Sequence, residues 1–153
     1  MATRGIIAVA NNNSIEEGWR GVYSHWDNNP ERMIAVLAIL VERDGYEKVI
    51  QTLITEHRSW SIVDPFRSDD EPNSVRGYGV FHEDEDLTDE NSWYTHDGGW
   101  YSWAEYAYVM TTEGLLVTRV VETGNMWESD KRDIQPKIFH PWSTIVPGVS
   151  QSA

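Results

Sequence analysis

The pattern of hydrophobic and polar positions along the first part of the chain is typical of β-strands. Residues 3–10 are rich in β-branched side chains and are followed by a polar turn cluster at residues 11–14. Residues 19–25 alternate, so that successive side chains fall on opposite faces of a strand. The pattern therefore predicts an antiparallel hairpin formed by residues 3–10 and 19–25.

The spacing of apolar residues then becomes helical. Asn29 and Pro30 predict a helix that begins at Pro30, with the Asn29 side chain as its cap. Apolar residues between positions 33 and 41 cover most of the circumference, which is typical of a buried helix, and Gly45 ends it. A second helix is predicted over residues 46–57, with one apolar stripe and a half-exposed surface.

The remaining apolar segments predict short strands. Residues 58–63 and 76–82 each read as a brief strand, and residues 104–111 and 115–121 form the clearest hairpin. Beyond residue 121, spaced prolines predict an irregular tail that wraps the domain. Its expected anchors are Trp127, Ile138, Phe139 and Trp142.

Together these elements predict an α+β fold: a mainly antiparallel sheet with two helices packed on one face, and an irregular proline-containing C-terminal tail. The length of 153 residues fits one domain spanning residues 1–153. Within it, residues 64–99 form an acidic, loop-rich insertion, and residues 122–153 form the wrapping tail.

Charge narrows the range of partners. The chain carries 25 acidic and 12 basic residues, a net charge of −13, and residues 64–99 hold much of the excess. Such a chain is poorly suited to bind nucleic acid directly or to dock on anionic membranes. It has no cysteine, and no apolar run reaches the ~20 residues that cross a bilayer. We therefore expect a cytoplasmic protein.

Several segments resemble a group of small uncharacterised proteins found in bacteriophages and prophages. The resemblance covers roughly the first 60 residues and the region 103–121. Its motifs are the Thr3-Arg4-Gly5 start, the Tyr23-Ser24-His25-Trp26-Asp27 segment before a long apolar helix, and the hairpin segments Glu105-Tyr106-Ala107-Tyr108-Val109 and Glu113-Gly114-Leu115-Leu116-Val117. It implies a phage origin and a shared fold, but no catalytic residues.

The strongest candidate site lies where the first hairpin meets the first helix. There the predicted strand end brings together Arg4, Tyr23, His25, Trp26 and Asp27. An imidazole and a carboxylate near free backbone N–H groups suit an anionic ligand or a general acid/base pair. The structural alternative is a corner in which Trp26 packs in the core and Asp27 caps the helix or orients His25.

A second candidate is an aromatic cluster around His96 and Trp100, which could stack on a nucleobase or bind a protein. The alternative is that these aromatic side chains are core contacts beneath a long loop. Carboxylates and histidines from His82 to Asp97 could hold a cation, but a solvated charge run is the simpler interpretation. We therefore assign no metal site and no cofactor.

No strong catalytic motif is present, which favours a binding function. We hypothesise a non-catalytic phage accessory protein that binds a host protein or a small nucleotide-like ligand in the bacterial cytoplasm, with an oligomer possible. One alternative is a DNA mimic, whose carboxylates over residues 64–97 would occupy a host DNA-binding protein. Another is a small hydrolase using His25 and Asp27.

Overall fold

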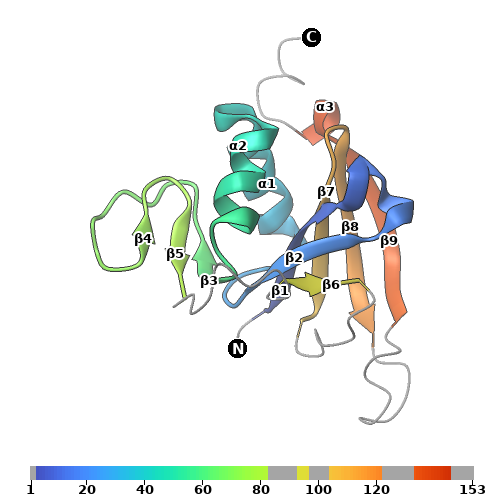
Figure 1. Ribbon diagram of the computed structural model, residues 1–153, viewed down its shortest axis with the longest axis horizontal. Helices are drawn as coiled ribbons and strands as arrows, with labels where there is room; N and C mark the ends of the chain where they lie inside the picture. The colour runs from blue at the N-terminus through green and yellow to red at the C-terminus, as the bar shows by residue number, and fades with distance from the viewer. Residues whose placement is uncertain (1–2, 83–92, 97–103, 122–132, 146–153) are drawn as a thin grey trace.

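The computed structural model of the chain describes residues 3–82, 93–96, 104–121 and 133–145. Within these residues all strands belong to one sheet, and two helices lie against one of its faces (Figure 1). The strands are β1 (Gly5–Ala10), β2 (Trp19–Ser24), β3 (Ser59–Val63), β4 (Ser74–Val75), β5 (Gly79–Phe81), β6 (Tyr94–Thr95), β7 (Tyr106–Met110), β8 (Gly114–Val121) and β9 (Asp133–Pro141). The α-helices are α1 (Pro30–Asp44), α2 (Tyr46–Ile50) and α3 (Trp142–Ile145).

The strands follow the order β4-β5-β3-β2-β1-β7-β8-β9 in the sheet. β3 pairs with the C-terminal end of β2, and β6 pairs with β2 closer to its N-terminal end. The pairs β1–β7 and β2–β3 are parallel, and the other described pairs are antiparallel. This arrangement confirms the predicted α+β class. It also confirms the two predicted hairpins, β1–β2 and β7–β8.

Helix α1 begins and ends where the sequence predicts. Gly45 follows it with a φ of 91°, and its N–H bonds to the Val41 carbonyl oxygen. The Asn29 side chain makes no capping hydrogen bond, so that part of the prediction was wrong. Burial is also less complete than predicted, because Ile34 and Ile39 are only half-buried.

The second predicted helix is present, but its second half is wound differently. α2 passes into a π-helical turn, η3 (Gln51–Thr55), where the Glu56 N–H bonds to the Gln51 carbonyl oxygen. Leu53 and Ile54 in this turn are fully buried.

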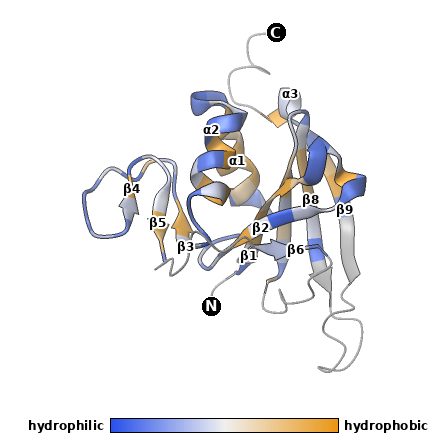
Figure 2. Ribbon diagram, viewed as in Figure 1, coloured by the Kyte–Doolittle hydropathy of each residue, from blue (hydrophilic) through white to orange (hydrophobic). Residues whose placement is uncertain are grey.

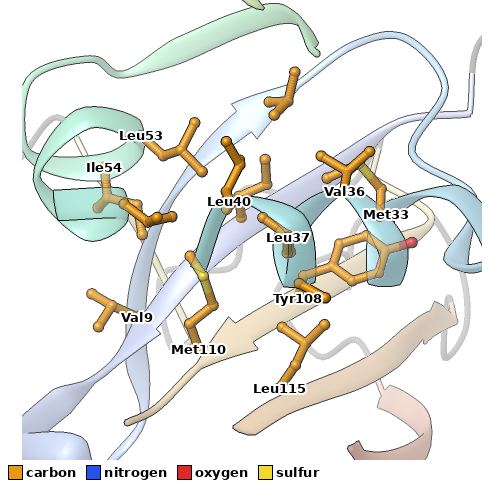
Figure 3. Packing of buried hydrophobic residues seen from close by; sticks show 14 of the residues in the cluster. Val9, Met33, Val36, Leu37, Leu40, Leu53, Ile54, Tyr108, Met110 and Leu115 are labelled. Carbon is orange, nitrogen blue, oxygen red and sulfur yellow. The ribbon is translucent and has the colours of Figure 1, made fainter. Parts of the chain in front are cut away.

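The main core lies between the helices and the sheet. Leu37 and Leu40 of α1 pack toward Val9, Tyr108 and Met110 of the sheet (Figure 3). Each fully buried leucine stabilises the fold by about 1.5–3 kcal/mol. A smaller apolar cluster covers the opposite face of β1, β2, β7 and β8. Figure 2 shows hydrophobic residues on parts of β1, β3 and the helices α1 and α2.

The C-terminal part is more regular than predicted. A nine-residue strand, β9, pairs with β8, and α3 follows it. Pro136 stands where the pairing shifts register between Thr118 and Val120, and among the described strands β9 lies at the edge of the sheet; both settings tolerate proline. The prolines therefore interrupt a strand here rather than abolish it.

Of the three expected anchors that the structure describes, only Trp142 is buried. Ile138 and Phe139 retain 52% and 39% of their accessible surface, so their prediction as anchors was wrong. Trp127 lies outside the described residues.

The acidic segment contains regular structure at its start, where β4 and β5 form a small hairpin beside β3. Arg43 at the end of α1 donates to the carbonyl oxygens of Pro65 and Gly77, both at 2.7 Å. It therefore links the segment that follows β3 to the turn between β4 and β5. Among the helices of the described chain, none is long and apolar enough to cross a bilayer.

Candidate functional site

The corner between β2 and α1 is held from inside by Asn28. Its side chain is fully buried, and its amide nitrogen donates to the carbonyl oxygens of Thr3, Ser24 and Trp26, each at 3.0 Å. The Tyr108 hydroxyl donates to the Asn28 carbonyl oxygen. Through its side-chain amide and its backbone carbonyl, Asn28 therefore links the corner to the residue before β1 and to β7, and fixes the path of the chain.

Around this corner the structure brings together most of the residues that the sequence singled out. The Tyr23 hydroxyl and His25 Nδ1 are 2.7 Å apart, and the His25 and Trp26 rings meet edge to face at 4.7 Å. Burial raises the pKa of Tyr23, and the nearby charge of Arg4 opposes that rise. Tyr23 therefore stays protonated at neutral pH.

Two expectations for the corner were wrong. Trp26 is 47% exposed and does not pack in the core. Asp27 has a φ of 60° and an exposed side chain, and within the described residues its carboxylate forms no hydrogen bond with His25 and no capping hydrogen bond with α1. Tyr23 orients the imidazole instead, so the acid/base pair expected of a hydrolase is not formed.

His96 lies at the other end of β2. Its Nδ1 accepts a hydrogen bond from the Trp19 N–H at 3.2 Å, and its ring rests on Gly18, where an added Cβ would lie 2.0 Å from a ring atom. β2 separates His96 from His25 by about 20 Å, given its six residues at roughly 3.3 Å each. The two histidines therefore do not share a site.

Of the aromatic cluster, Trp93 and Tyr94 fall within the described residues, whereas Trp100 lies outside them. Trp93 donates from Nε1 to the Ile54 carbonyl oxygen at 2.8 Å, and the Arg58 guanidinium carbon lies 3.8 Å from its ring centroid. Trp93 is thus a packing contact on the main core rather than a free stacking surface.

In the described part of the acidic segment, the carboxylates are partly neutralised. Arg67 lies 2.8 Å from Asp69, and Arg76 lies 3.0 Å from Asp70. Asp69 also accepts from the Ser74 hydroxyl, which lowers the pKa of that carboxyl. Most of the carboxylates on which the DNA-mimic alternative depends, at residues 83–90 and 97, lie outside the described residues, so that alternative stays a prediction.

A different site emerges between the first half of α1 and strands β7 to β9. A groove of about 370 Å³ lies over the helix-facing side of these strands. α1 and α2 cover the middle of the sheet, whereas β8 and β9 extend beyond them (Figure 1). The groove is lined by Pro30, Ile34, Tyr106, Val117, Arg119, Ile138 and His140.

Strand geometry explains why these side chains share one face. Val117 and Arg119 are two residues apart on β8, so both point to the same side of the sheet. Val117 pairs with Ile138 and Leu115 pairs with His140, which places both β9 side chains on that side. The groove thus combines apolar side chains with the exposed guanidinium of Arg119, the imidazole of His140 and the phenol of Tyr106.

The sequence reasoning missed this groove because its outer wall belongs to the region predicted as an irregular tail. The available signal was the spacing of Ile138 and His140, two residues apart after a proline, which fits a short edge strand. No pattern in the sequence places β9 beside β8 rather than elsewhere.

Comparison with known proteins identifies no relative of this chain. Searches against protein-family models, curated proteins and solved structures find no match to the chain.

Within the described residues, no group of three or more histidine, aspartate or glutamate side chains is placed to hold a metal ion.

Proposed function

We propose that this chain is a non-catalytic binding protein that holds a small anionic ligand with an apolar body in the groove between α1 and β7–β9. The observation that carries the proposal is the groove itself, with apolar walls around an exposed arginine. Its volume of about 370 Å³ falls within the usual range for small-molecule sites, roughly 300–1,000 Å³.

Different lining residues would contact the apolar and the anionic parts of the ligand. Ile34, Val117 and Ile138 offer an apolar surface from three different elements. Arg119 offers planar N–H donors that match a phosphate or carboxylate. A nucleotide-like ligand meets both requirements, with its base on the apolar floor and its phosphate on Arg119.

Binding is favoured over catalysis by the chemistry of the groove. Among its described lining residues there is no carboxylate to serve as a general base or to pair with His140. The resemblance to phage proteins and the acidic composition support an accessory role in the cytoplasm of a bacterial host.

The proposal is tested with 8-anilinonaphthalene-1-sulfonate, a fluorescent probe that joins an anionic group to an aromatic body. We expect the probe to bind the wild-type chain and AMP to displace it. Arg119→Ala should weaken probe binding about tenfold or more, because a charge-assisted contact is lost. Arg76→Ala is the matched control, since Arg76 is exposed, pairs with Asp70 and does not line the groove.

Equal loss in Arg119→Ala and Arg76→Ala would mean that the probe responds to overall charge and would contradict the groove site. Probe binding that Arg119→Ala weakens but AMP leaves unchanged would keep the groove and exclude a nucleotide-like ligand. Native mass spectrometry of the freshly purified protein then identifies any retained molecule.

A further inference from the structure

The polar side chains among the described lining residues of the groove are those of Tyr106, Arg119 and His140. Within the described part of the chain, none of these side chains forms a hydrogen bond or an ion pair with another residue. Arg67 and Arg76, by contrast, each contact an aspartate, in a chain that has 25 acidic residues. The donors and acceptors of the groove therefore remain available to a ligand.

The register of the strands places two of these side chains together at one end of the groove. Tyr106 pairs directly with Arg119 across β7 and β8, and both line the groove. Directly paired residues have Cβ atoms within about 5.5 Å of each other, so one anionic group can accept hydrogen bonds from the phenol and the guanidinium together. This pair forms the anion-binding end of the groove.

His140 lies at the other end. It pairs with Leu115, which is four residues from Arg119 along β8. With about 3.3 Å per residue and about 4.8 Å between strands, the Cα atoms of Arg119 and His140 are roughly 14 Å apart. Val117 and Ile138 pair with each other and lie between these two ends. A ligand that lies along the groove therefore meets paired donors, then apolar side chains, then an imidazole.

We propose that the ligand of this groove is a nucleoside monophosphate whose phosphate accepts hydrogen bonds from Arg119 and Tyr106 and whose base forms a hydrogen bond with His140. This inference rests on the proposed function, and it names the class of ligand and the residue that selects it. A nucleobase has an apolar ring face for Val117 and Ile138, and its edge carries hydrogen-bond donors and acceptors. An imidazole both donates and accepts, so His140 matches either kind of edge atom.

Simpler ligands leave part of the groove unmatched. A sugar phosphate has no apolar ring for Val117 and Ile138, and a nucleoside has no anion for Arg119. A medium-chain fatty acid satisfies both of these requirements but places a methyl group against His140. The imidazole then loses water without gaining a hydrogen bond, which lowers affinity. Sites that bond a polar group of their ligand discriminate in this way against ligands that lack it.

Competition against bound 8-anilinonaphthalene-1-sulfonate measures the affinity of each class. The competitors are AMP, ribose 5-phosphate and adenosine, which each carry one part of AMP, and octanoate, which carries an anion on an alkyl chain. We expect AMP to bind about tenfold more tightly than any of the other three. AMP that binds no more tightly than ribose 5-phosphate or octanoate would overturn this inference and leave the groove site of the proposed function intact.

The substitution His140→Phe tests the far end of the groove. It keeps a planar ring but removes both nitrogens, so the affinity for AMP should fall about fivefold while the affinity for octanoate rises. A general disturbance of the groove would weaken both ligands instead. His82→Phe is the matched control, because His82 is exposed and does not line the groove. Equal changes for the two ligands in His140→Phe, or no change, would overturn the role of His140.

The substitution Tyr106→Phe tests the anion-binding end. It should weaken AMP and octanoate alike by about tenfold, because both place an anion there. Circular dichroism checks that each variant remains folded. A loss confined to one of the two ligands would contradict a shared anion position. Probe binding that Arg119→Ala leaves unchanged would overturn the proposed function itself, and this inference with it.

Discussion

The two edges of the described sheet, at β4 and at β9, are held in different ways. The β4 edge is fixed by side chains: Arg43 donates to the carbonyl oxygens of Pro65 and Gly77, and the Tyr78 hydroxyl donates to Asp44 at 2.6 Å. The β9 edge is fixed by the backbone ladder with β8 and by the buried Trp142 at its end.

The side chains that each edge exposes differ as well. Near β4 the exposed residues are mainly charged and several are paired, as in the Arg67–Asp69 and Arg76–Asp70 contacts. At β9 the exposed residues include Ile138 and Phe139. A polar, internally bonded edge discourages strand addition. The comparison therefore separates an edge whose exposed side chains are charged and paired from an edge that exposes apolar side chains.

The largest expected effect is at the end of β9. Trp142→Ala removes a buried aromatic side chain whose Nε1 donates to the Thr111 carbonyl oxygen at 2.8 Å. The free energy of unfolding should fall by about 3–5 kcal/mol, measured by urea titration. Phe66→Ala is the control, because Phe66 is 75% exposed and should change stability by no more than about 0.5 kcal/mol. Similar losses in both variants would show that Trp142 does not anchor the edge.

An intermediate effect is expected at the opposite edge. Arg43→Ala leaves the carbonyl oxygens of Pro65 and Gly77 without their donor, which should cost about 1–3 kcal/mol. Hydrogen exchange should accelerate over residues 64–78 while β8 and β9 keep their protection. Arg76→Ala, which removes only an exposed ion pair, should leave exchange unchanged. Uniform acceleration across the sheet would contradict a local role for Arg43.

The smallest expected effect concerns Asp44 and depends on pH. The hydrogen bond from Arg43 holds the pKa of the Asp44 carboxyl below its usual value of 3.8, so its ionised form stabilises the folded state. That contribution is complete above the unfolded pKa and is lost as the pH falls through the lower folded pKa. Asp44→Asn should therefore reduce stability by about 1 kcal/mol or less at pH 7 and flatten the decline below about pH 4.

The same substitution reports on Tyr78. Burial, together with the hydrogen bond to Asp44, raises the pKa of Tyr78 to about 12. Asp44→Asn should lower that pKa, which the absorbance of tyrosinate at 295 nm follows. An unchanged Tyr78 titration would show that burial alone causes the shift.

Local patterns determined much of the fold. The β-branched content of residues 3–10, the alternation in residues 19–25, the Pro30 start and the Gly45 stop each reflect interactions within a few residues, and the structure confirms the elements that they predict. The grouping of Arg4, Tyr23, His25 and Trp26 at one corner could likewise be predicted from the sequence, because these residues belong to one hairpin and the turn that follows it. Asn28, which holds that corner, was missed because its partners include Thr3 and Tyr108, distant in sequence.

What the sequence determined by itself is the class of fold, the acidic charge, and the positions of the first hairpin and the long helix. Tertiary structure decided that β1 pairs in parallel with β7, that β9 joins β8, and that α1 leaves their helix-facing side open as a groove. It also decided that His96 and His25 stand at opposite ends of β2. The physical reason is range: propensities, caps and turns act between near neighbours, whereas strand order, sheet edges and grooves depend on contacts between residues far apart in the chain.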